Sequence, residues 1–170
     1  MGKCFKRSHH CGLLTAAEAG QQVTLSGWVA KRRDHGGLIF IDLRDRSGIV
    51  QIVIDTETAG DSFKVAEDMR NEFVVSITGC VRLRTEDTIN RNIPTGEIEV
   101  EASSLEILNS AKTPPFYIQD GVDVDENVRL RYRYLDLRRP EMQKNLILRH
   151  KVTKLMRDFL DNRSFIEIET

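Results

Sequence analysis

Alternation of apolar and polar residues is the feature that most constrains how this 170-residue chain folds. Between Gln22 and Ile54, β-branched and aromatic residues recur with a period of two and are interrupted by turn-forming residues. This period predicts strands with one buried face rather than helices. Turn signals at Gly36-Gly37 and Ser47-Gly48 separate them. We therefore expect a first strand from Gln22, a second over Leu38–Arg44 and a third over Ile49–Ile54.

A helix and two more strands are expected further along the chain. Asp61-Ser62 is a cap signal, and Phe63, Val65, Ala66 and Met69 follow it at helical spacing. Residues 73–84 and 97–108 alternate again, which predicts strands four and five. Five short antiparallel strands with a helix between the third and fourth are typical of the OB-fold, a Greek-key barrel in the mainly β class. An SH3-like barrel is the alternative, but a helix in that gap argues against it.

The last third of the chain has a different pattern. Pro114-Pro115 ends the barrel, and the acidic stretch Asp120–Glu126 is predicted to be a linker. Pro140-Glu141 and apolar residues at three-to-four spacing predict one long helix that ends near Asp161-Asn162. Phe165–Thr170 alternates like a strand. Because this helix face and strand have no partner in the sequence, we expect them to begin a larger domain.

One face of the predicted barrel carries residues suited to binding nucleic acid. Ile39 and Ile41 share the inner face of the second strand, so Phe40 between them points outward. Gln51 and Glu99 take outward positions on the third and fifth strands, and Lys31-Arg32-Arg33 ends the first strand. Bases stack on aromatic rings, amides and carboxylates read base edges, and cations meet phosphates. This face therefore predicts binding of a single-stranded or looped nucleic acid, unless Phe40 is covered by a loop.

The composition limits the function further. With 25 Lys+Arg and 26 Asp+Glu the chain has a net charge of -1, so a nucleic-acid surface must come from clustering. No apolar run approaches the length of a membrane span, and no secretory segment precedes the cysteines, so a cytoplasmic protein without membrane contact is expected. Cys4, His9, His10 and Cys11 match no zinc spacing, so we expect no metal site. No residue grouping indicates catalysis within these residues.

Four sequence motifs resemble a known enzyme family. They are Gly27-Trp28-Val29, Arg32-Arg33-Asp34-His35-Gly36-Gly37, Phe40-Ile41-Asp42-Leu43-Arg44-Asp45-Arg46-Ser47-Gly48 and Arg131-Tyr132-Arg133-Tyr134-Leu135-Asp136-Leu137-Arg138-Arg139-Pro140. In this order they resemble bacterial-type aspartyl-tRNA synthetases, which are class II enzymes. The resemblance runs from about Cys11 to the end. It implies that residues 1–113 are an anticodon-binding domain, 114–140 a hinge and 141–170 the start of a catalytic domain.

The resemblance also implies which residues bind RNA and which partners the protein has. The positions that match anticodon contacts of the family are Arg33, Phe40, Gln51 and Glu99, with Lys31, Arg70, Arg82 and Asn90 as further contacts. The whole enzyme is expected to use ATP and Mg²⁺ to attach aspartate to tRNA-Asp, and to be a homodimer that binds no DNA. This fragment is expected to bind neither cofactor. A stand-alone OB-fold module that binds single-stranded nucleic acid without ligase activity remains the alternative.

One position bears on which tRNA is charged. His35 resembles the residue of family members that charge both tRNA-Asp and tRNA-Asn, whereas stricter members have a bulky aliphatic there. The partner position falls near Asp87 and Thr88, where this sequence matches neither type. We therefore expect tRNA-Asp as a substrate, with the relaxed type favoured over the strict one.

Overall fold

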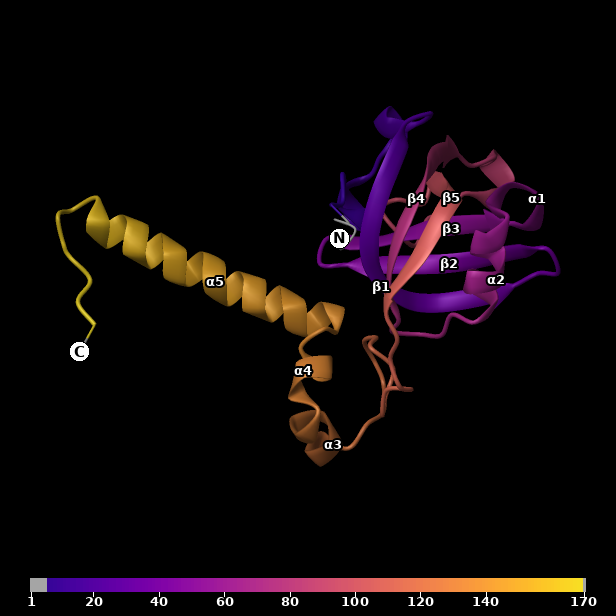
Figure 1. The fold of residues 1–170 in the computed structure, drawn as a ribbon. Coiled ribbons are helices and arrows are strands. Elements are labelled where there is room, and N and C mark those ends of the chain that lie inside the picture. Colours follow the sequence, from indigo (N-terminus) through magenta and orange to yellow (C-terminus); the bar gives the residue numbers. More distant parts are fainter. Residues whose placement is uncertain (1–5, 170) are drawn as a thin grey trace, which may run out of the picture. The chain divides into compact units, whose positions relative to one another are not determined.

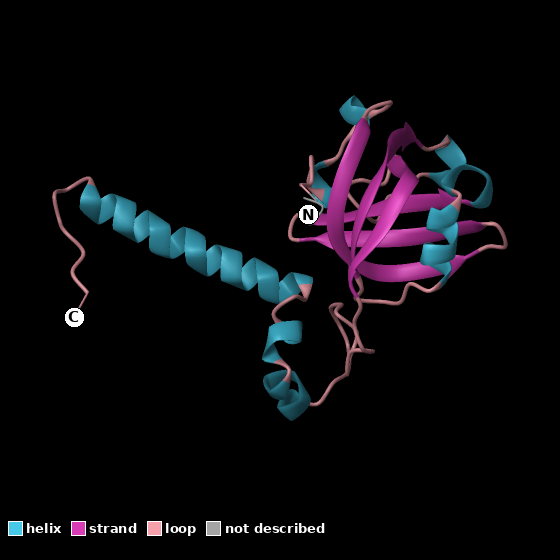
Figure 2. Ribbon diagram, in the orientation of Figure 1, coloured by secondary structure: helices cyan, strands magenta, loops and turns pink. Residues whose placement is uncertain are grey.

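Five strands form a closed barrel in the computed structural model, which describes residues 6–169. The strands (magenta in Figure 2) are β1 (Gln22–Asp34), β2 (Leu38–Asp45), β3 (Gly48–Asp55), β4 (Val74–Leu83) and β5 (Ile98–Asn109). Their order is β1-β2-β3-β5-β4, and β4 pairs with β1 to close the barrel. The predicted OB-fold is confirmed, except that β3 and β5 pair in parallel rather than antiparallel. That parallel pairing is short and joins only Ile52 and Val53 to β5.

The barrel interior is filled mainly by alternate residues of the strands. On β2, Ile39, Ile41 and Leu43 are completely buried, and β1 and β5 contribute Leu25 and Val100 in the same way. Burying an aliphatic side chain of this size contributes about 1.5–3 kcal/mol. The alternation read from the sequence therefore separates core from surface correctly on these strands. It leaves the intervening side chains, Phe40 among them, on the outer face.

The segment between β3 and β4 differs from its expected form. Two short helices stand where one was predicted, α1 (Thr56–Ala59) and α2 (Asp61–Glu67) (Figure 1). Gly60 separates them with a φ of 52°, a left-handed conformation that interrupts the helix. The predicted cap is also wrong, because Gly60 is the N-cap of α2, and Ser62 Oγ instead accepts a hydrogen bond from the Leu105 amide of β5 (3.2 Å).

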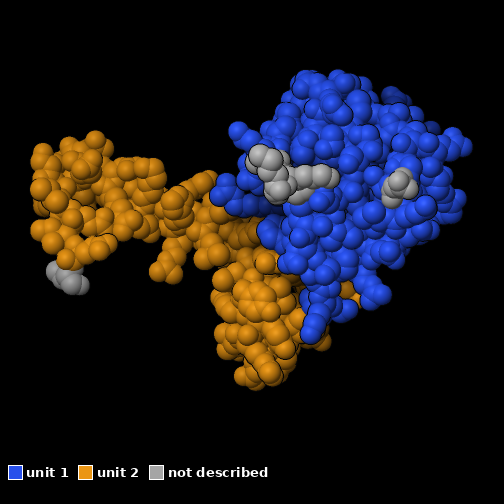
Figure 3. Space-filling view, viewed as in Figure 1, with its two compact units in different colours: residues 1–114 blue, residues 115–170 orange. Residues whose placement is uncertain are grey.

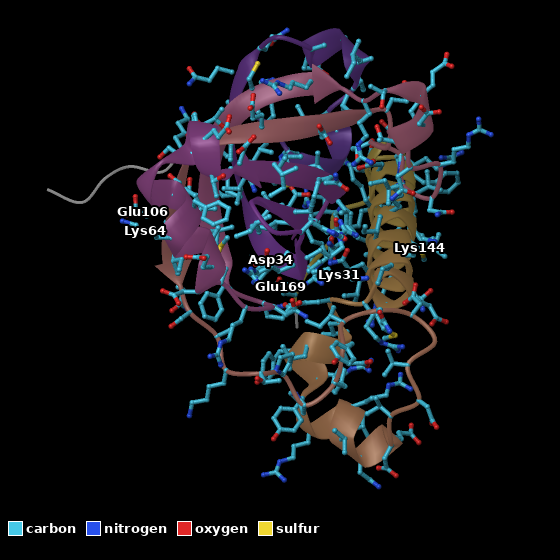
Figure 4. All side chains as sticks on the ribbon, turned by 90° about the vertical axis from the view of Figure 1, so that its right-hand side faces the viewer. Lys31, Asp34, Lys64, Glu106, Lys144 and Glu169 are labelled. Atoms are coloured by element: carbon cyan, nitrogen blue, oxygen red, sulfur yellow. The ribbon has the colours of Figure 1, made fainter. Side chains whose placement is uncertain are left out.

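Helix α2 closes against the barrel through its apolar residues. Ala66 is completely buried, and Phe63 packs against the core. Met69 is also buried, although it lies beyond the end of the helix. Figure 4 shows Lys64 of α2 and Glu106 of β5 at the edge where the helix meets that strand.

The N-terminal segment is tied to the barrel by one buried carboxylate. Asp45 accepts hydrogen bonds from the Cys11 amide (2.9 Å) and from His10 Nδ1 (3.2 Å), next to the short helix η1 (Cys11–Leu13). His9 contacts Ser8 instead, and Cys4 lies outside the described residues. Burial raises the pKa of the Cys11 thiol, so this thiol stays protonated. His10 and Cys11 therefore anchor the segment.

The chain divides into two compact units, Met1–Pro114 and Pro115–Thr170 (Figure 3). The second unit contains α3 (Glu126–Arg131), α4 (Arg133–Asp136) and α5 (Pro140–Asp161), and α5 confirms the predicted long helix. The predicted final strand is wrong, because residues 165–169 form no strand. A strand needs a neighbour for its backbone hydrogen bonds, and the described contacts of this segment are instead local, such as the exposed ion pair between Arg157 and Glu167 (2.8 Å).

Asp136 organises the short helices of the second unit. Its carboxylate is completely buried and accepts hydrogen bonds from Arg129 (3.1 Å), Arg139 (2.8 Å) and Arg133. Burial acts to raise the pKa of Asp136, but the hydrogen bonds and charges of the arginines outweigh burial and lower it. Three of the five arginines crowded in this part of the sequence are thus bound to one internal carboxylate.

No helix in the described part of the chain is long and apolar enough to span a membrane.

Candidate nucleic-acid interface

Phe40 lies half-buried on the outer face of β2, as its position in the alternation predicts. Arg33 of β1 is its neighbour across the strand pair, and Val53 of β3 lies opposite on the other side. His35, in the loop between β1 and β2, places its ring edge-on to the Phe40 ring, with the centroids 5.5 Å apart. The His35 ring therefore contacts the Phe40 ring at nearly a right angle (81°) and does not stack on it.

A chain of polar contacts runs across the outer face beside this ring. Arg33 donates to Asp42 (2.6 Å) and to the Gln51 amide oxygen (3.4 Å). Gln51 in turn donates to Glu99 on β5 (3.4 Å). These contacts join residues up to 66 positions apart, from β1 to β5, and orient an amide and a carboxylate on the same surface.

A hollow of about 530 Å³ lies over this surface, and we call it the Phe40 hollow. Seven of the sequence-predicted residues line it: Arg33, His35, Phe40, Gln51, Arg82, Thr88 and Glu99. Such a lining offers a ring for stacking, polar groups for base edges and cations for phosphates.

The other predicted residues lie outside the Phe40 hollow. Lys31 is exposed and pairs with Asp42 in the strand register, and Arg70 is exposed in the segment between α2 and β4. Asn90 uses its side-chain oxygen to accept a hydrogen bond from the Asn92 amide (3.0 Å), which shapes its own loop. Asp87 is exposed in the short helix η3 (Glu86–Thr88).

Arg84 is the residue of this hollow that sequence reasoning missed. Its side chain is only 4% exposed, and it donates to the backbone oxygens of Ile98 (3.0 Å) and Thr88 (3.1 Å). Glu99 lies 3.7 Å from its Nε, and burial lowers the pKa of Arg84. Its Nη2 is buried without a hydrogen-bond partner among the described residues. The sequence contained a signal, because Arg84 lies two residues after Arg82 and alternation predicts the same face for both.

Fold and site together define a class of protein. A closed five-stranded barrel of this order, with an aromatic ring and polar side chains gathered on its outer face, is the architecture of an OB-fold. The chain belongs to the OB-fold nucleic acid binding domain family, whose model matches residues 23–108. Residues 125–170 match a second family, described as tRNA synthetases class II (D, K and N). The resemblance seen in the motifs is confirmed.

Curated relatives cover almost the whole chain. The aspartate–tRNA(Asp/Asn) ligase of Heliobacterium modesticaldum is 66% identical over 166 residues, which are 98% of this chain and 27% of the relative. The enzyme of the same name from Moorella thermoacetica is 66% identical over 164 residues, with 96% and 27% covered. The chain therefore spans about a quarter of the length of these relatives.

Solved structures show the same fold in proteins of different kinds. The asparaginyl-tRNA synthetase of Pyrococcus horikoshii superposes with a TM-score of 0.82 at 24% identity, over 98% of this chain and 38% of that chain. An OBody bound to hen egg-white lysozyme superposes with a TM-score of 0.57 at 28% identity, over 65% and 100%. Since one of these barrels binds a protein, the function of this chain has to be argued from its site.

Proposed function

We propose that this chain is the anticodon-reading part of an aspartate–tRNA ligase. The observation that carries the proposal is the convergence of Arg33, Gln51 and Glu99 around the half-buried ring of Phe40. The ring stacks on a base, Gln51 and Glu99 contact base edges, and Arg33 and Arg82 meet phosphates. The names of the curated relatives support this reading.

The remaining predicted contacts belong to the same proposal. Lys31, Arg70 and Asn90 lie outside the Phe40 hollow, so they would touch parts of the RNA beyond the stacked base. The whole enzyme would attach aspartate to tRNA-Asp with ATP and Mg²⁺, in the cytoplasm and as a homodimer that does not bind DNA. Because the chain spans about a quarter of its relatives, we place the ATP and Mg²⁺ chemistry in the rest of the enzyme.

We propose in addition that the protein accepts tRNA-Asn. His35 lines the Phe40 hollow together with Thr88, whereas Asp87 does not. His35 is exposed, and its imidazole can both donate and accept a hydrogen bond. It can therefore pair with either of the two bases that distinguish the tRNAs. Both relatives above are named for tRNA-Asp and tRNA-Asn.

Stem-loop binding by the 170-residue chain tests the main proposal. We expect the anticodon stem-loop of tRNA-Asp to bind more tightly than a stem-loop of equal length with an unrelated anticodon, measured by fluorescence anisotropy. Equal affinity for the two would favour the stand-alone module that binds single strands without reading an anticodon. Absence of binding to either would contradict both.

A further inference from the structure

A second hollow, of about 320 Å³, lies on the outer side of β4 and β5. Its described lining includes Gln22, Thr58, Cys80, Arg82, Glu101 and Ser103, and we call it the Cys80 hollow. Arg82 lines both this hollow and the Phe40 hollow, so the two are adjacent on the barrel surface.

The strand register explains why one hollow continues the other. Arg82 pairs with Glu99, and two residues further along the same strands Cys80 pairs with Glu101. Residues two apart on a strand share a face, so the outward row passes from the Phe40 hollow to the Cys80 hollow. Next to Cys80 the register shifts, and Gly79 approaches β5 so closely that a Cβ there would lie 2.2 Å from the Glu101 oxygen. This irregularity leaves Ser103 exposed beside the hollow.

The lining of the Cys80 hollow suits a nucleotide. Glu101 forms an ion pair with Arg82 and accepts a hydrogen bond from the Thr58 hydroxyl (3.4 Å), so its charge is compensated. The Arg82 side chain is nevertheless 58% exposed, which leaves its guanidinium open to a phosphate between the two hollows. Gln22 adds an amide, and the Ser103 hydroxyl, which donates to the Thr78 carbonyl (3.1 Å), can still accept a hydrogen bond. The described lining includes no aromatic ring, so binding there depends on hydrogen bonds rather than stacking.

We propose that the Cys80 hollow binds the nucleotide that flanks the bases held in the Phe40 hollow, with Arg82 contacting the phosphate that joins them. This inference rests on the proposed function, because it extends the same RNA strand along the barrel. It assigns a role to Arg82 and Ser103 at a position away from the stacked base.

RNA length tests the proposal on the 170-residue chain. The probes are the anticodon trinucleotide of tRNA-Asp and the two tetranucleotides that extend it by one loop nucleotide at the 5′ or the 3′ end. We expect one tetranucleotide to bind about 2- to 10-fold more tightly than the trinucleotide. This gain in affinity corresponds to one or two net hydrogen bonds. Ser103→Trp, which fills the hollow, should remove this gain, whereas Ser104→Trp on the neighbouring exposed residue should keep it. Equal affinity for all three RNAs would overturn the inference, while failure of all three to bind would count against the proposed function.

The thiol of Cys80 offers a second measurement, made on a chain in which the residues of the hollow are unchanged. Cys80 is half-buried and Cys11 is fully buried. In a chain with Cys4→Ser, iodoacetamide should therefore modify Cys80. A further chain with Cys80→Ser identifies the modified product by mass. The tetranucleotide that binds more tightly should slow this modification several-fold when it is bound, and the trinucleotide should not. Equal rates with and without bound RNA, or no modification of the free chain, would contradict an open hollow that takes a nucleotide.

Discussion

The ring of Phe40 lies on the surface although both of its chain neighbours, Ile39 and Ile41, are completely buried. A large apolar side chain in such a position costs free energy unless a partner covers it, and the His35 ring contacts it only in a T-shaped arrangement. The polar contacts of Arg33 and Gln51 beside it are likewise exposed to a ligand. At the scale of single residues, these side chains lie outside the barrel core, where the proposed function needs them.

Replacement of Phe40 tests this arrangement. Phe40→Ala should weaken binding of the tRNA-Asp stem-loop by about 1–3 kcal/mol, because one stacked base loses its platform. The far-ultraviolet circular dichroism spectrum and the melting temperature should stay close to those of the wild type, since the ring is outside the core. Leu108→Ala on β5, which is exposed and does not line the Phe40 hollow, is the matched control. A Phe40→Ala chain that unfolds would show that the ring is needed by the core instead.

His35 carries the prediction about tRNA choice. His35→Leu in the full-length enzyme should lower charging of tRNA-Asn more than charging of tRNA-Asp, by about 1–3 kcal/mol in the ratio of kcat/KM, because an aliphatic side chain leaves a base edge unpaired. Aminoacylation assays with the two tRNAs measure this ratio. An equal decrease for both tRNAs, or a wild-type enzyme that rejects tRNA-Asn, would show that His35 only shapes the turn and does not select the tRNA.

Among the elements, the strands and the short helices of the second unit are stabilised in different ways. The strands bury an alternating apolar face, so their stability comes from the barrel core. Helices α3 and α4 are only six and four residues long, and isolated helices of this length are unstable in water. Their position depends on the arginines gathered around Asp136 and on the small cluster of Phe116, Ile118 and Leu135.

Substitution of Asp136 tests how far these helices depend on it. Asp136→Asn should destabilise residues 126–139 by about 1–3 kcal/mol, because the buried arginine contacts lose their charge. Amide hydrogen exchange of those residues measures the effect. Asp158→Asn, which removes one exposed pair with Lys154 on α5, should cost less than about 0.5 kcal/mol.

The same carboxylate predicts a pH dependence. Because the pKa of Asp136 in the folded chain lies below its usual value of 3.8, its contribution is complete above that value and is lost as the pH falls through the lowered pKa. Protection of residues 126–139 should therefore decrease below about pH 3.8 in the wild type. The Asp136→Asn chain should lack this decrease, and an equal decrease in both chains would assign it to another group.

For the molecule as a whole, the positions of the charged residues matter more for RNA binding than the net charge does. The net charge of -1 gives no overall attraction to RNA, yet Arg33, Arg82 and Arg84 all line the Phe40 hollow. The arginines of the second unit are used differently, since three of them bind Asp136. Most apolar side chains of α5 are exposed, Leu155 at 68% among them, although Arg163 lies over the Phe159 ring.

The sequence by itself determined which strand positions face the core and which face solvent, because alternation acts between neighbouring residues. It therefore predicted the barrel, the long helix and the outward direction of Phe40, Gln51 and Glu99. Only the tertiary structure decided which outward residues meet, because closure of the barrel brings β1, β3 and β5 together across long stretches of sequence. Pairing of β4 with β5 put Arg84 beside Glu99, the contacts of Asn90 stayed within its own loop, and residues 165–169 formed no strand. The physical reason is that hydrogen bonds and ion pairs between distant residues depend on distances that no local pattern contains.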